Sequence, residues 1–171
     1  MAQVGDEVWV GARCNIYAYN IDTYFQEGTF KAHDGDVHVI MSTKPTQAWT
    51  ASDIDIRVWQ REVRLIVKRD TRERETRRET ELVWLNAQDN SLSHSATLKI
   101  HTGKILCLGM ADGLVWSGSF DTNIIIWDVE TFQPVQELSG GHDDAVKTLT
   151  VTSAGAWSGS MDGKLVRWTR S

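Results

Sequence analysis

Tryptophan recurs along this chain at a nearly constant interval, and this repeat constrains the fold more than any other feature of the sequence. Seven of the eight tryptophans follow it. Trp9, Trp49, Trp116 and Trp157 are 40, 67 and 41 residues apart, and Tyr19, Trp59, Trp127 and Trp168 are 40, 68 and 41 apart. Each of His33, His101 and His142 precedes a tryptophan of the second series by 26 residues. We infer four units of 40–41 residues, the second of which carries an insertion of about 27 residues.

Short apolar segments within each unit predict strands separated by turns that contain Asp and Gly. One strand is expected at 37–42, 105–110 and 146–151, a second at 48–52, 115–119 and 156–160, and a third at 54–59, 123–127 and 164–168. A fourth is clearest at 24–30 and 132–138. The first unit would begin at its second strand and the last would end at its third, which predicts 14 strands. The chain is therefore expected to be all-β.

The units resemble the WD40-repeat family. The resemblance rests on Gly141-His142, on Trp127-Asp128 and on the period near 41, and it covers the chain except for the insertion. It implies a β-propeller whose blades are four-stranded antiparallel sheets. The chain supplies about three and a half such blades, so we expect a partial or open propeller. The Trp-Ser-Gly-Ser sequence is similar to that in WD40 modules of signalling proteins such as DENN-domain exchange factors and inositol polyphosphate 5-phosphatases.

The whole chain is expected to be one propeller domain, residues 1–171. Its predicted blades cover residues 5–32, 33–100, 101–141 and 142–171, and the charged insertion occupies 61–95 of the second blade. Three explanations of the incomplete ring are considered. The chain is a segment of a longer propeller, which we favour, or an open arc that pairs with another copy or another chain, or an imperfect four-bladed ring.

Three units contain a histidine, a hydroxyl residue, an aspartate and a tryptophan at matching positions. A hydrolase triad uses similar residue types, but a triad occurs once in a domain, whereas this set occurs three times. Resemblance to WD40 blades implies a structural hydrogen-bond chain from Trp through Ser or Thr and His to Asp, and no catalytic residues. The predicted tetrads are His33, Thr50, Asp53 and Trp59; His101, Ser117, Asp121 and Trp127; and His142, Ser158, Asp162 and Trp168. The first unit lacks the set.

Binding to a protein partner is the function that the resemblance implies. It places the contacts at the third and fifth residues after each histidine and just before each aspartate. These positions are Asp36, His38 and Ser52; Lys104, Leu106 and Phe120; and Ala145, Lys147 and Met161. Phe120 and Met161 are the most informative, because turns prefer small polar residues and large apolar side chains there suit interface anchors.

The insertion is rich in charge. Residues 61–81 hold eight of the 18 basic residues and six of the 23 acidic ones. Val63, Leu65 and Val67 alternate with charged residues, so the segment opens like a strand, the fourth of its blade in one interpretation, and Trp84 could pin it to the body. The interpretations are a solvated extension, a docking loop, or a basic patch for RNA or acidic lipid.

Composition limits the remaining functions. The net charge of −5 argues against general nucleic-acid binding. No apolar run approaches 18 residues and no signal peptide is visible, so we expect neither a membrane span nor secretion. Cys14 and Cys107 are expected to be reduced thiols. We expect no cofactor, no metal and no enzyme activity, and a cytoplasmic scaffold within a signalling or trafficking protein. The alternatives are a propeller that binds RNA or acidic lipid and a propeller hydrolase.

Overall fold

Four antiparallel sheets make up the computed structural model, which describes residues 1–61 and 92–169. The first sheet contains β1 (Ala2–Val4), β2 (Glu7–Ala12), β3 (Asn15–Asn20) and β4 (Gln26–Lys31). The second contains β5 (Val39–Lys44), β6 (Gln47–Ala51), β7 (Ile56–Arg61) and β8 (Leu92–Leu98). The third contains β9 (Ile105–Ala111), β10 (Leu114–Ser119), β11 (Ile124–Asp128) and β12 (Pro134–Leu138), and the last contains β13 (Val146–Thr152), β14 (Gly155–Ser160) and β15 (Leu165–Thr169). The all-β prediction is confirmed.

The strand count differs from the prediction in the first sheet. The described residues form 15 strands rather than 14, because the first three residues after Met1 add β1 alongside β2. Strand β1 has only three residues, which is too short for an alternating pattern to reveal it from sequence. The first sheet is therefore four-stranded, and only the last has three strands in the described part of the chain.

The fourth strand of the second sheet is β8 in the described part of the chain. Strand β8 pairs with β7 along its length, from Ile56 opposite Leu98 to Arg61 opposite Leu92. It is mostly exposed, as an outermost strand can be, and lacks the apolar pattern that marks an inner strand. The predictions for Val63, Leu65, Val67 and Trp84 concern residues outside the described ranges.

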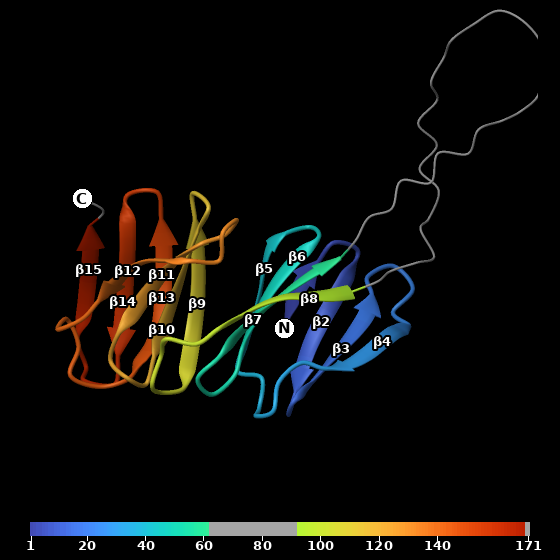
Figure 1. Cartoon of the computed structure of the whole chain (residues 1–171), viewed down its shortest axis with the longest axis horizontal. Helices are drawn as coiled ribbons and strands as arrows, with labels where there is room; N and C mark the ends of the chain where they lie inside the picture. Colours follow the sequence, from blue (N-terminus) through green and yellow to red (C-terminus); the bar gives the residue numbers. More distant parts are fainter. Residues whose placement is uncertain (62–91, 170–171) are drawn as a thin grey trace, which may run out of the picture.

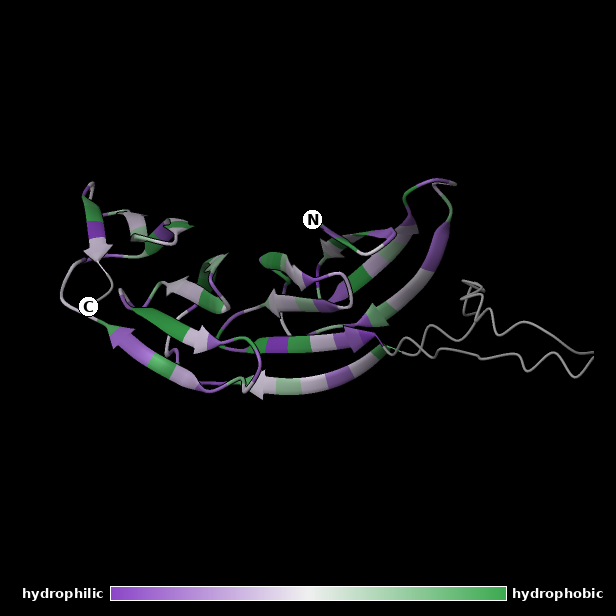
Figure 2. Cartoon of the chain, turned by 90° about the horizontal axis from the view of Figure 1, so that it is seen from above, coloured by the Kyte–Doolittle hydropathy of each residue, from purple (hydrophilic) through white to green (hydrophobic). Residues whose placement is uncertain are grey.

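The four sheets follow one another along an arc that is open on one side (Figures 1 and 2). In each sheet the strands run in sequence order from one edge to the other. The hydrophobic core of the described residues is divided into three clusters, one between each pair of successive sheets. Trp9 packs with Ala48 and Trp59, Trp49 with Val115 and Trp127, and Trp116 with Val146 and Ala156. The first series of tryptophans therefore joins the sheets to one another.

Both cysteines are free thiols, in agreement with the expectation. Cys107 is buried between the third and last sheets, and burial raises the pKa of its thiol to about 12. Among the described residues, no helix is long and apolar enough to cross a membrane.

Candidate protein-binding face

A buried hydrogen-bond chain crosses the third sheet from its third strand to the turn before its first strand. The indole nitrogen Nε1 of Trp127 donates to Ser117 Oγ at 2.8 Å, and Ser117 Oγ is 2.8 Å from His101 Nε2. The other ring nitrogen, His101 Nδ1, is 2.8 Å from Asp121 Oδ2. Each polar side chain of this hydrogen-bonded set has a partner. A buried polar network stabilises a fold only when its members are paired in this way.

The last sheet repeats this chain with its own residues. Trp168 Nε1 donates to Ser158 Oγ at 2.7 Å, and Ser158 Oγ is 2.7 Å from His142 Nε2. His142 Nδ1 is 3.1 Å from Asp162 Oδ2. The same four residue types therefore hold the strands of two successive sheets in one arrangement.

In the second sheet the aspartate differs from the predicted one. His33 Nε2 is 2.7 Å from Thr50 Oγ1, and Trp59 Nε1 donates to that oxygen at 2.9 Å. Asp55, and not Asp53, lies 2.8 Å from His33 Nδ1. The Asp53 assignment is wrong.

The length of one hairpin explains this difference. The β10–β11 and β14–β15 hairpins have three-residue loops, between Ser119 and Asn123 and between Ser160 and Lys164, in which aspartate is the middle residue. The β6–β7 hairpin has only two loop residues between Ser52 and Asp55, because the Ser52 N–H donates directly to the Asp55 carbonyl. This loop has no middle residue, so the aspartate that directly precedes β7 reaches the histidine instead.

The first sheet uses a different polar arrangement. Its tryptophan, Trp9, donates from Nε1 to Glu7 Oε2 at 2.7 Å. The guanidinium of Arg61, from the second sheet, also donates to Glu7. A buried carboxylate and arginine therefore tie the first two sheets together.

The aspartates of the third and last sheets are held in their ionised form. Burial acts to raise the pKa of Asp121, but the charge of His101 and the N–H groups of Asn123 and Thr102 hold that pKa below its usual value. Burial also acts to raise the pKa of Asp162, whereas hydrogen bonds from the Asp143 and Lys164 N–H groups and from His142 keep it at about 2. These carboxylates are structural acceptors.

Burial acts on the pKa of the histidine of the second sheet in the opposite direction, because it disfavours the charged imidazolium. It lowers the pKa of His33 below the usual value, and the hydrogen bond and charge of Asp55 only partly oppose this effect. The hydroxyls of Thr50, Ser117 and Ser158 are fully buried as well. A substrate cannot reach them in this arrangement, so the three histidine–hydroxyl–aspartate sets do not have the geometry of a hydrolase nucleophile. No group of three or more potential metal ligands occurs within residues 1–61 and 92–169.

The nine residues of the predicted contact positions divide into exposed and buried groups. Ala145 is buried, and Ser52 is buried with its hydroxyl donating to the Asp36 carbonyl at 2.9 Å. Leu106 is partly buried, whereas Asp36, His38, Lys104, Phe120, Lys147 and Met161 are exposed. Phe120 and Met161 expose 55% and 57% of their surface at equivalent loop positions. Seven of the nine side chains can therefore contact a partner.

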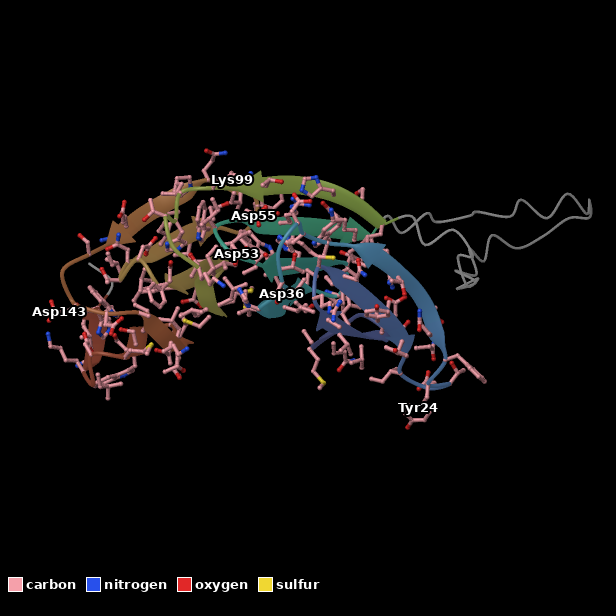
Figure 3. All side chains as sticks on the ribbon, turned by 90° about the horizontal axis from the view of Figure 1, so that it is seen from below. Tyr24, Asp36, Asp53, Asp55, Lys99 and Asp143 are labelled. Carbon is pink, nitrogen blue, oxygen red and sulfur yellow. The ribbon has the colours of Figure 1, made fainter. Side chains whose placement is uncertain are left out.

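Two residues at the tip of the β6–β7 hairpin were missed as members of this face. Asp53 follows Ser52 as Phe120 follows Ser119, so it occupies the matching position in the second sheet. Its carboxylate lies 3.6 Å from His38 Nε2 and 3.4 Å from Lys104 Nζ, and it therefore links the second and third sheets (Figure 3). Ile54, the next residue, is exposed. The sequence feature that indicates the shorter hairpin is the spacing from Thr50 to Trp59, which is one residue shorter than the spacing from Ser117 to Trp127.

Comparisons with known proteins identify the fold. The chain is similar to a computationally designed protein, Ika4, in its crystal structure, with a TM-score of 0.74, 20% identity, and coverage of 98% of this chain and 88% of Ika4. It is also similar to the designed Ika8, with a TM-score of 0.72, 20% identity, and coverage of 96% of this chain and 43% of Ika8. Both are β-propeller proteins, and this chain has the β-propeller fold over about three and a half blades.

Two segments in the second half of the chain match a model of a repeat family. Residues 92–128 and 132–169 match the model of the WD domain, G-beta repeat. These two segments therefore carry WD40 repeats. A search of the curated proteins finds no match.

Proposed function

We propose that this chain is a non-enzymatic protein-interaction scaffold, a WD40 module of a larger cytoplasmic signalling or trafficking protein. WD40 repeats typically bind protein partners, and the family is generally non-enzymatic. The observation that supports the proposal most strongly is the pair of exposed side chains Phe120 and Met161. A large apolar side chain on a loop tip contributes binding energy when a partner covers it.

The backbone beneath these two side chains is held in place. The Phe120 N–H donates to the Lys104 carbonyl at 2.7 Å, and the Met161 N–H donates to the Ala145 carbonyl at 3.0 Å. Asp121 and Asp162, the next residues, are anchored to buried histidines. A partner would therefore meet two side chains whose backbone is already ordered, which reduces the entropy lost on binding.

Charged residues are exposed on the same predicted face as these apolar side chains. Lys104 and Lys147 contribute ammonium groups, and Asp36 and Asp53 contribute carboxylates. Mixed charge around an apolar centre is the usual anatomy of a protein interface, in which the rim adds specificity more than affinity.

The double substitution Phe120→Ala and Met161→Ala tests this function. We expect a normally folded protein that no longer captures the proteins which the wild type retains from a cell extract, as measured by quantitative mass spectrometry. Val135→Ala is the matched control, because Val135 is equally exposed but lies on the outer strand β12. Loss of the same proteins from the control, or retention by the double variant, would contradict the proposed face.

A further inference from the structure

The outward face of the last sheet contains apolar side chains that every other sheet buries. Trp9, Trp49 and Trp116 are at most 2% exposed because the following sheet covers them, whereas the equivalent Trp157 is 45% exposed. Leu165 is 67% exposed, although the ladder position that it occupies opposite Gly159 is filled elsewhere by fully buried isoleucines. These isoleucines are Ile16, Ile56 and Ile124. The last sheet therefore shares Trp157 and Leu165 with the inner sheets. It differs at Arg167, which occupies the position of the buried Ala18, Val58 and Ile126 and whose guanidinium carbon lies 6.0 Å from the centroid of the Trp157 ring.

The opposite end of the arc has the complementary face. Val8 and Tyr19 are paired in the first sheet as Val115 and Trp127 are in the third. In the third sheet this pair is buried against the second sheet, but in the first sheet both residues remain partly exposed. Tyr17 likewise occupies the position of the buried Ile125. The first sheet thus presents the kind of surface that receives a preceding sheet.

The β3–β4 turn of the first sheet has the same backbone geometry as the β11–β12 turn, which carries an aromatic contact between two sheets. In the β11–β12 turn the Phe132 N–H donates to the Asp128 carbonyl at 3.0 Å, and in the β3–β4 turn the Tyr24 N–H donates to the Asn20 carbonyl at 3.0 Å. Both aromatic residues have a φ of +59°. Phe132 packs edge-on against Trp49 of the preceding sheet, with ring centroids 6.0 Å apart.

Tyr24 has no such contact in the described part of the chain and is almost completely exposed. It projects from one end of the arc, whereas the last sheet, marked by Asp143, forms the other end (Figure 3). Phe132 contacts Trp49, which lies on the second strand of the preceding sheet. An equivalent contact for Tyr24 would need a tryptophan on the second strand of a sheet that precedes the first one. Trp157 is such a residue: it is 45% exposed, and no other sheet of the described chain packs against it.

We propose that two copies of this chain associate head to tail, with the last sheet of each packed against the first sheet of the other. Tyr24 of one copy would lie against Trp157 of its partner, as Phe132 lies against Trp49 within one chain. A second copy is the occupant we favour because the chain itself carries both complementary faces, and each repeats an interface that already occurs inside the molecule.

Symmetry and length agree with this assembly. Two arcs joined at both ends form a closed two-fold ring, in which no apolar sheet face remains uncovered. The chain spans less than half of the designed propeller Ika8, so an arc of this kind fits within a longer propeller. The proposal is independent of the scaffold function, because Trp157 and Tyr24 are not among the residues of that face.

Sedimentation equilibrium measures the association directly. We expect the 19.3 kDa chain to sediment at twice that mass and Trp157→Lys to sediment as a folded monomer, because a second positive charge beside Arg167 at the centre of the interface cannot be buried unpaired. Val135→Lys, which introduces the same charge on β12 at a site that is more exposed than Trp157, should remain a dimer. A wild-type monomer at every concentration, or dissociation of the Val135 variant alone, would overturn the proposal.

Cross-linking tests the head-to-tail geometry. One chain carries Tyr24→Cys and another carries Trp157→Cys, both with Cys14→Ser, and a short bis-maleimide is added; Cys107 is protected by burial. We expect a covalent dimer only when the two variants are mixed. A dimer from the Tyr24 variant alone would show a head-to-head contact, and a link within single chains that carry both substitutions would show closure of one arc on itself. Either result contradicts the proposal.

Discussion

At the scale of single residues, the repeated histidine sets determine how the strands of each sheet are held. In the third sheet, Asp121 receives hydrogen bonds from the Thr102 and Asn123 N–H groups in addition to its contact with His101. One carboxylate therefore fixes the turn before β9 and the turn before β11. The set acts as a clamp between two loops that are distant in sequence.

Replacing Asp121 by Ala should destabilise the protein. The substitution leaves a histidine nitrogen and two N–H groups without their acceptor, and an unsatisfied buried polar group costs about 1–3 kcal/mol. The free energy of unfolding in urea measures the loss. Asp36→Ala removes an exposed carboxylate from the corresponding turn of the second sheet and should change stability by less than about 0.5 kcal/mol. Equal effects of the two substitutions would show that Asp121 does not clamp the turns.

Most members of these sets could be predicted from the sequence, because histidine and tryptophan keep a constant spacing of 26 residues. Asp55 could not be identified in this way. Asp53 lies at the tip of one short hairpin and Asp55 just after it, and the spacing from the histidine favours Asp53, because it is 20 residues after His33 as Asp121 is after His101. Only the hydrogen bond that closes a two-residue loop decides between them.

At the scale of strands and turns, the inner strands are easier to predict than the outer ones. Strands β6, β10 and β11 are buried on both faces, so their apolar runs are evident in the sequence. Strand β8 reads LSHSATL and is mostly exposed, because an outermost strand needs hydrogen bonds from one neighbour and little apolar area. Its position could not be predicted from hydrophobicity for this physical reason.

The first residue of β14 shows how closely two strands approach. Gly155 has a φ of +132°, and a Cβ atom there would lie 2.1 Å from the Trp168 carbonyl oxygen. Gly155→Ala should therefore destabilise the protein by more than about 1 kcal/mol, since both the backbone angle and the space exclude a side chain. Gly28→Ala in β4, where a Cβ atom would meet nothing within 4 Å, is the control for urea unfolding. A neutral Gly155→Ala would mean that the β14–β15 pair opens readily.

At the scale of the whole molecule, stability depends on contacts between neighbouring sheets and on the polar clamps inside them. A stack of this kind gains stability from each sheet and from each interface with its neighbour. The first and last sheets each have one such neighbour in the described chain, whereas the middle sheets have two. The proposed association would give every sheet two neighbours.

The stability of the fold should decrease as the pH falls. The pKa of His33 is lower in the folded protein, so the unfolded chain takes up a proton first, and stability is lost as the pH falls below about 6.5 towards the folded pKa. The pKa of Asp162 is also lowered, to about 2, so its contribution is present above about 3.9 and is lost as the pH falls towards 2. Asp121 acts in the same direction.

Urea unfolding midpoints at several pH values measure this dependence. We expect a first decrease between about pH 7 and 5, which His33→Gln should remove and His94→Gln, at an exposed histidine, should leave. A second decrease is expected below about pH 4. A midpoint that stays constant from pH 7 to 5 in the wild type would show that His33 does not control stability in that range.

The β7–β8 ladder ends with Arg61 directly opposite Leu92, although 30 residues separate them in sequence. Both ends of that long connection are thus fixed side by side by the sheet itself. For a flexible connection, doubling the length costs only about 0.6 kcal/mol of closure entropy. This corner is therefore a natural insertion point, where a connection can lengthen, shorten or be exchanged in the course of evolution, or be replaced by a grafted peptide, while the propeller keeps its strand order.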